Sequence, residues 1–165
     1  MPDNQPLLQV QNLSKSFGAV AALARINFEL HPGDVLGVVG QRGSGKSTLF
    51  QLLSGVYTPS AGEISLRGRR VVFRSAFQAQ KAGIDTVHQN PVLADNLNVL
   101  RNVFLGREIC LERHFKLWPK DGEMAAIARK FFQEFDLPAD FIEKNTGSLS
   151  TEHRQIVSLA RVLCQ

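Results

Sequence analysis

The chain has 165 residues, of which 44 % are hydrophobic and 21 % are charged, so it can bury one core and fits one domain with a subdomain. No apolar run approaches the roughly 18 to 20 residues that a membrane-spanning helix needs, and residues 1–10 lack a secretory signal pattern. The net charge of +4 comes from Lys and Arg residues that are scattered along the chain, apart from the short run at residues 67–70. This scatter does not favour nucleic-acid binding. We expect a soluble, cytosolic protein.

The first half of the sequence alternates strand patterns with turns. Residues 7–10 and 26–30 alternate apolar and polar side chains, which predicts half-buried strands in an antiparallel β layer. Residues 35–39 are short and apolar, as expected for a strand buried on both faces. A glycine-rich loop then leads into a helix from about Lys46 that ends at Gly55, and residues 63–66 and 83–87 predict two further strands.

The second half has the texture of helices from about Asn90. Apolar residues recur with helical spacing over residues 123–135 and predict ordinary core packing along one face. Ser150 is a good N-cap for a last helix toward Cys164, with Glu152 in its first turn. Cys110 and Cys164 have no metal-ligand spacing and are expected to be buried or half-buried thiols without chemistry. The apolar helix face predicted over residues 123–135 comprises Met124, Ile127, Ala128, Phe131, Phe132 and Phe135.

The loop at residues 40–47 has a glycine, four residues, and then Gly-Lys-Ser, the pattern of a phosphate-binding loop. The glycines let successive backbone N–H groups point into one cavity, while Lys46 would reach the β- and γ-phosphates. The Ser47 hydroxyl would ligate Mg²⁺. A glycine-rich turn with an incidental lysine is the alternative, and the flanking strand and helix patterns disfavour it. The residues expected to bind nucleotide are Gly40, Gly43, Ser44, Gly45, Lys46, Ser47 and Thr48.

Residues 13–18, 22–23, 26–30 and 32–34 resemble the start of ATP-binding cassette (ABC) ATPases. The resemblance implies that Phe17 stacks on adenine, by the offset contact of two flat rings. Read from burial preference alone, Phe17 could equally be a core residue at a strand end.

Residues 83–89 and 98–108 are similar to the glutamine loop and following segment of the carbohydrate-import ATPases. The resemblance implies that Gln89 touches Mg²⁺ and the attacking water, and that the next loop meets a membrane subunit. An amide suits this task because it offers a donor and an acceptor without charge. Without the family, Gln89 is a polar residue at a strand end.

Residues 149–155 lie where this family has its Leu-Ser-Gly-Gly-Gln signature, whose helix N-terminus caps the γ-phosphate bound by the opposite subunit. Ser150 keeps the pattern, but Thr151 and Glu152 replace the glycines and His153 replaces the glutamine. Glu152 would place negative charge near a phosphate and weaken the contact.

The expected fold is therefore an α/β P-loop NTPase of the ABC type, with an N-terminal antiparallel β layer, a partial parallel core sheet and a helical subdomain. We expect residues 1–92 to form the β layer and phosphate-loop core, and residues 93–165 the helical subdomain up to the signature helix. The sequence ends before the family's apolar strand with the Mg²⁺-binding Asp and the catalytic Glu. We therefore expect this chain, taken alone, to hydrolyse ATP negligibly.

The predicted function is the ATP-binding part of a sugar-import ATPase on the inner face of the cell membrane. Its cofactors would be ATP and Mg²⁺, with Lys46 and Gln89 in catalysis and Ser47 and Gln89 at the metal. Its partners would be a second cassette and membrane permease subunits, without nucleic acid. Two alternatives are a non-catalytic nucleotide-binding or interaction module and an ABC protein outside transport.

Overall fold

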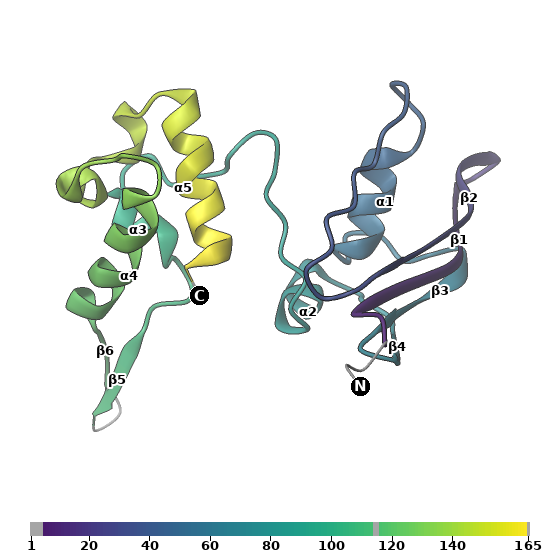
Figure 1. The fold of residues 1–165 in the computed structure, drawn as a ribbon, viewed down its shortest axis with the longest axis horizontal. Helices are drawn as coiled ribbons and strands as arrows, with labels where there is room; N and C mark the ends of the chain where they lie inside the picture. Colours follow the sequence, from purple (N-terminus) through teal and green to yellow (C-terminus); the bar gives the residue numbers. More distant parts are fainter. Residues whose placement is uncertain (1–4, 114–115, 165) are drawn as a thin grey trace. The chain divides into compact units, whose positions relative to one another are not determined.

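The computed structural model describes residues 5–113 and 116–164, which divide into two compact units, Met1–Asp85 and Thr86–Gln165 (Figure 1). Each unit has its own buried apolar cluster. The boundary at residue 85 follows from the contacts within each compact unit. The separation into a β layer with the phosphate-loop core (residues 1–92) and a helical subdomain (residues 93–165) stays a prediction.

The first unit is built on a four-stranded antiparallel sheet with the strand order β2-β1-β3-β4. The alternating patterns near the N-terminus belong to the long hairpin of β1 and β2, in which Leu8 pairs with Leu30 and Phe17 pairs with Val20. The predicted antiparallel β layer and the strand near residues 63–66 are thus confirmed. The strands are β1 (Leu8–Phe17), β2 (Val20–Leu30), β3 (Ala61–Leu66) and β4 (Arg69–Val71).

The helix α1 (Lys46–Leu53) covers this sheet with Leu49 and Leu52, which pack into the cluster formed by the strands. Gly55 follows the helix with φ 73°, and the Val56 N–H donates to the Gln51 carbonyl oxygen at 2.9 Å. This is the left-handed cap predicted for Gly55, since a glycine accepts positive φ without steric cost. A shorter helix, α2 (Ala76–Lys81), completes the unit.

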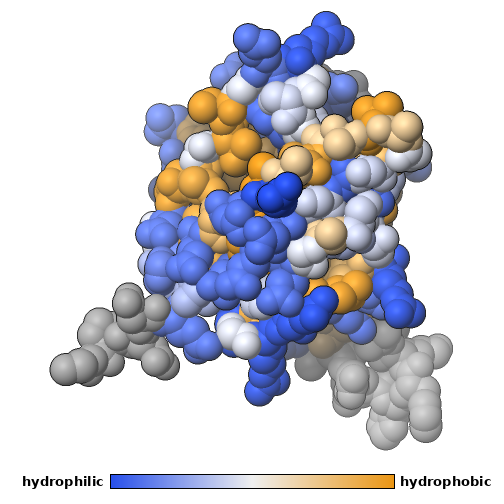
Figure 2. All heavy atoms as spheres, turned by 90° about the vertical axis from the view of Figure 1, so that its right-hand side faces the viewer, coloured by the Kyte–Doolittle hydropathy of each residue, from blue (hydrophilic) through white to orange (hydrophobic). Residues whose placement is uncertain are grey.

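The strands predicted at residues 35–39 and 83–87 are wrong, because neither segment forms strand hydrogen bonds in the structure. Val35 is 97 % exposed and Val39 is 93 % exposed. A strand exists only through pairing, and within the described residues β1 to β4 pair solely with one another. The described residues therefore do not form the expected parallel core sheet. Apolar surface is visible as orange patches among polar residues in Figure 2.

The second unit is mainly helical, and its core lies between α3, α4, α5 and a short 3₁₀ turn. Phe132 of α4 packs edge-on against Phe141 of that turn, with ring centroids 5.1 Å apart. None of the helices in the described part of the chain has the length and apolar character needed to cross a bilayer. The elements are α3 (Val99–Val103), β5 (Cys110–Arg113), β6 (Lys116–Pro119), α4 (Asp121–Gln133), the 3₁₀ turns Ala139–Glu143 and Thr146–Ser148, and α5 (Thr151–Leu163).

The apolar face predicted for residues 123–135 is confirmed for its central members and wrong at two positions. Met124, Ala128 and Phe132 are buried, whereas Ile127 is 37 % exposed and Phe135 is 40 % exposed. The buried stripe is rotated toward Ala125, which lies one residue from Met124 on the inner side of the helix. Phe135 falls beyond the end of α4, where the helical spacing no longer determines its direction.

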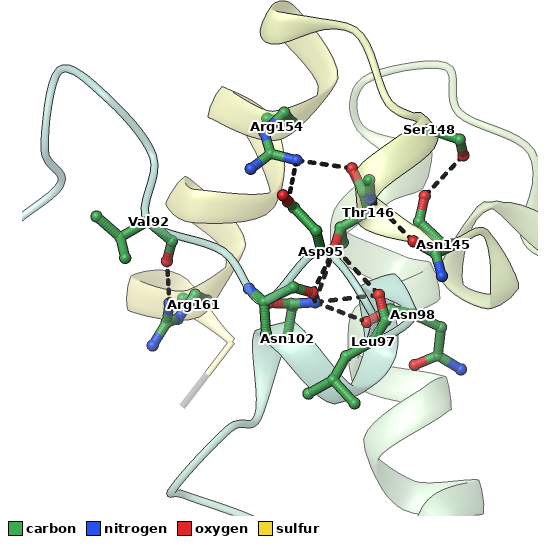
Figure 3. A network of polar contacts seen from close by, with 12 residues as sticks. Val92, Asp95, Leu97, Asn98, Asn102, Asn145, Thr146, Ser148, Arg154 and Arg161 are labelled. Atoms are coloured by element: carbon green, nitrogen blue, oxygen red, sulfur yellow. Dashed lines mark hydrogen bonds and ion pairs between the residues drawn. The ribbon is translucent and has the colours of Figure 1, made fainter.

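A buried polar network joins the segment before α3 to the segment before α5 (Figure 3). The Asn102 side chain is fully buried; its amide nitrogen donates to the Ala94 carbonyl at 3.0 Å, and its oxygen accepts from the Ala94 N–H at 2.8 Å. The same nitrogen lies 3.1 Å from the hydroxyl of Thr146, which is also fully buried. Both connecting segments are thus held by side chains that water cannot reach.

Replacing Asn102 by Ala should lower the free energy of unfolding by about 2–4 kcal/mol, because buried N–H and C=O groups lose their partner. Urea unfolding followed by circular dichroism measures this. Gln133→Ala removes an exposed amide from α4 and serves as the matched control, with an effect within about 0.5 kcal/mol. Equal stabilities of the two variants would contradict the role given to the network.

Candidate nucleotide-binding site

The glycine-rich loop runs directly into the N-terminus of α1, as the sequence predicts. Gly45 is the N-cap residue with φ 89°, and its carbonyl oxygen accepts the first helical hydrogen bond from the Leu49 N–H at 2.9 Å. A glycine offers no capping side chain, so the N–H groups of the first turn remain available to an outside acceptor. The positive end of the helix dipole lies at the same place, which favours an anion.

Gly45 is required by the packing of the loop against the β hairpin. A Cβ atom at this position would overlap the carbonyl oxygen of Ala22 and lie 2.8 Å from Leu23 Cδ2. Gly43 has a similar φ of 83°, but a Cβ atom there would meet nothing within 4 Å. Gly45 is therefore needed for the close approach of the loop to the hairpin, whereas Gly43 is needed only for its backbone conformation.

The ammonium group of Lys46 is held inside the loop by loop oxygens. Its Nζ donates to the carbonyl of Gly40 at 2.6 Å and to that of Gln41 at 2.7 Å, with Ser44 Oγ at 3.4 Å. The loop thus wraps one positive charge at the N-terminus of α1. The predicted contact of Lys46 with the β- and γ-phosphates stays a prediction.

A cavity of about 380 Å³ adjoins the loop and is lined by two kinds of surface. Gly40, Ser44 and Lys46 line one part, whereas Leu23, Ile26 and Phe28 of β2 line another. Apolar side chains do not compensate the desolvation of a phosphate. The polar part of this cavity is therefore formed by the loop and the first turn of α1. The side chain of Ser47 is exposed on this turn and that of Thr48 is half-buried.

Phe17 ends β1 and remains 43 % exposed. Its ring meets that of Tyr57 edge-on, with centroids 5.1 Å apart, and Lys15 Nζ lies 5.1 Å from the Phe17 centroid. The sequence analysis missed Tyr57, because no local pattern signals a contact between segments so distant in the chain, and it assigned no role to Lys15.

Gln89 belongs to the second unit and its side chain is exposed. Its backbone oxygen accepts a hydrogen bond from Gln155 Nε2 of α5 at 2.6 Å. The metal set of Ser47 and Gln89 thus draws on two separately described units, and it stays a prediction. Among the described residues no group of three or more His, Cys, Asp or Glu side chains is arranged to hold a metal ion.

The residues at the start of α5 divide into a cap, an exposed pair and a packing residue. The Ser150 hydroxyl accepts from the His153 N–H at 3.3 Å, which confirms the predicted N-cap. Thr151 and Glu152 are exposed, and Glu152 lies in the first turn, where the helix dipole favours a carboxylate. The His153 ring instead packs edge-on against Phe141, with centroids 5.3 Å apart. Of the signature-like residues, Ser150, Thr151 and Glu152 are thus exposed, and His153 is half-buried.

Further along α5, two arginines bind the segment that follows Gln89 (Figure 3). Arg154 pairs with Asp95 at 2.7 Å and also donates to the Thr146 carbonyl at 2.9 Å, and Arg161 donates to the Val92 carbonyl at 2.9 Å. The sequence reading missed these contacts, because each joins residues far apart in the chain. Together with Gln155 they fasten the glutamine segment to the signature-like helix.

The predicted burial of the two thiols is confirmed, since Cys164 is buried and Cys110 is half-buried. Burial raises the pKa of the Cys164 thiol to about 11, with a further contribution from the nearby Glu134 carboxylate. The thiolate form needed for reaction is therefore scarce at neutral pH.

A glycine-rich loop that wraps a lysine at a helix N-terminus, beside an antiparallel β layer, defines a nucleotide-binding protein of the phosphate-loop class. The family model described as ABC transporter matches residues 23–165, and the chain belongs to this family, whose members bind ATP.

The chain is similar to several curated sugar-import proteins. It is 40 % identical to the fructose import ATP-binding protein FrcA of Rhizobium meliloti, over 95 % of this chain and 62 % of that protein. It is 38 % identical to the ribose import ATP-binding protein RbsA 1 of Rubrobacter xylanophilus, over 96 % of this chain and 31 % of that protein. The chain thus spans less than two thirds of the length of these relatives.

Solved structures support the same fold. A nucleotide-free ATP-binding cassette from an ABC transporter is 27 % identical with a TM-score of 0.77, over 96 % of this chain and 65 % of that one. MJ1267, also an ATP-binding cassette of an ABC transporter, is 26 % identical with a TM-score of 0.80, over 98 % and 66 %. The predicted ABC ATPase fold is therefore confirmed, and the chain covers about two thirds of these cassettes.

Replacing Gly45 by Ala should destabilise the first unit by at least about 2 kcal/mol more than replacing Gly43 by Ala. Both variants force a Cβ into a positive-φ conformation, which costs about 1–2 kcal/mol, but only the first also displaces the hairpin. Urea denaturation of the two variants gives the difference. Equal losses of stability would show that the hairpin does not press on the loop.

Proposed function

We propose that the chain is the ATP-binding part of an ABC-type sugar importer, where it couples the binding and hydrolysis of ATP to carbohydrate uptake. The observation that carries the proposal is the loop that holds Lys46 against the N-terminus of α1. The sugar-import names of the relatives support the choice of transported solute. In the complete protein we place the chain on the cytoplasmic face of the membrane.

Recognition of the triphosphate would rest on the loop and the first turn of α1. Backbone N–H groups of Gly43 and of residues 45–48 would donate to phosphate oxygens, and Lys46 would exchange its loop carbonyls for the β- and γ-phosphates. The exchange is chemically reasonable because a charged acceptor forms a stronger hydrogen bond than a neutral carbonyl. Phe17 would stack against the base from the end of β1.

Ser47 and Gln89 are proposed as the residues that hold Mg²⁺. Both side chains are exposed and offer neutral oxygen atoms, the ligand type that this ion accepts. When bound, the ion would neutralise charge on the phosphates during an in-line attack by water. Gln89 would orient that water through its amide, from a segment that Gln155 holds by its backbone.

The proposed partners are a second cassette and membrane permease subunits. In such a pair, the start of α5 would face a nucleotide held by the other cassette. The negative charge of Glu152 would repel the γ-phosphate, so this contact should be weaker than one made by a glycine-rich turn. We propose no nucleic-acid partner.

A non-catalytic interaction module is the second candidate, and one observation favours it. Val35 and Val39 are almost fully exposed in a segment without strand partners, and apolar surface of this kind invites association. The two candidates differ in whether the loop binds nucleotide.

Calorimetric titration with Mg-ATP tests the proposal on this chain. We expect saturable binding that Lys46→Ala weakens by about ten- to one hundredfold, since a hydrogen bond to a charged group contributes about 1.5–3 kcal/mol. Lys130→Ala removes an exposed lysine from α4 as the matched control and should leave the affinity unchanged. Absence of binding by the unaltered chain would reject the proposal and favour the interaction module.

A further inference from the structure

Three side chains from two distant segments meet at the end of β1. Lys15 and Phe17 come from the strand, and Tyr57 follows the glycine cap of α1. Lys15 Nζ lies 5.1 Å from the ring centroid of Phe17 and 5.6 Å from that of Tyr57, and it donates to the Thr58 carbonyl at 2.8 Å. The two aromatic rings are 5.1 Å apart at an interplanar angle of 74°. We call these three residues the aromatic platform.

The platform is a fixed surface rather than a chance contact of loose side chains. Lys15 ties the strand to the turn through Thr58, and the Ser16 N–H donates to the Ser60 hydroxyl at 3.1 Å beside it. The Tyr57 N–H also donates to the Gln51 carbonyl of α1 at 3.1 Å. The backbone on both sides of the ring pair is therefore held in place, while Phe17 is 43 % exposed and Tyr57 is 37 % exposed.

The platform lies within reach of the phosphate loop. Gly45 of the loop lies against Ala22 of β2. Val20, two residues before Ala22 on β2, pairs with Phe17 of β1. At about 3.3 Å per residue, Ala22 and Val20 are separated by roughly 7 Å along β2. A ribose and its first phosphate span a similar length. A nucleotide bound by the loop can therefore bring its base to the platform.

We propose that Tyr57 is a positioning residue for nucleotide binding, which fixes the plane of the Phe17 ring so that one face is free to stack on a flat base. The edge-on contact holds the Phe17 ring at a defined angle, and the Lys15 ammonium lies over a ring face, where its charge favours the electron-rich ring surface. A base on the free face would complete the stack. This inference rests on the proposed function, because it requires nucleotide at the phosphate loop.

The test compares two ligands on this chain by calorimetry in the presence of Mg²⁺: ATP, and inorganic tripolyphosphate, which lacks base and ribose. Tyr57→Leu removes the ring but keeps an apolar side chain, and should weaken ATP binding by roughly two- to tenfold, the range of an aromatic pair contact. Tripolyphosphate binding should stay unchanged. Tyr57→Phe keeps the ring and should restore the affinity for ATP.

Phe77→Leu is the matched control, because Phe77 is an exposed aromatic residue on α2 with Lys81 Nζ 4.6 Å from its ring centroid. It should change neither affinity. The inference is overturned if Tyr57→Leu leaves the ratio of the two affinities unchanged. This outcome includes an equal loss of affinity for both ligands, which a purely structural role of Tyr57 would produce. If the unaltered chain does not bind tripolyphosphate, the phosphate loop itself fails and the proposed function falls with it.

Discussion

The close approach of Gly45 to the carbonyl of Ala22 is the contact on which the first unit depends. It presses the phosphate loop against the β hairpin, so the N-terminus of α1 and the end of β1 have a defined separation. The aromatic platform and the loop thereby both contact the β1–β2 hairpin. Because a Cβ atom at residue 45 would overlap the Ala22 carbonyl, the loop can approach the hairpin this closely only with glycine at this position.

The second unit combines an apolar helical core with polar contacts that join its connecting segments. Asn102 and Thr146 join the segments that precede α3 and α5, and Arg154 and Gln155 extend this connection to Asp95 and Gln89. Buried, fully bonded side chains give such a network a single arrangement, because any alternative leaves polar groups without partners. In the proposed function, the glutamine segment and the signature-like turn would thus move together with α5.

Features encoded within a few neighbouring residues could be predicted from the sequence. The phosphate loop, the Gly55 cap and the Ser150 cap follow from local backbone requirements, and the β1–β2 hairpin follows from alternation. Residues 35–39 were predicted wrongly because apolar character does not supply a partner strand. Tyr57 and Arg154 carried no signal, since their contacts with Phe17 and Asp95 join residues distant in the chain.

In the proposed function, the loop and the first turn of α1 bind phosphate through backbone N–H groups. An amide ¹⁵N–¹H correlation spectrum of the chain, titrated with Mg-ATP, tests this at individual residues. We expect saturable shifts concentrated at Gly43, Gly45, Lys46 and Ser47, with smaller shifts near Phe17. Shifts that are absent from this loop at saturation, or that appear only in the second unit, would contradict it.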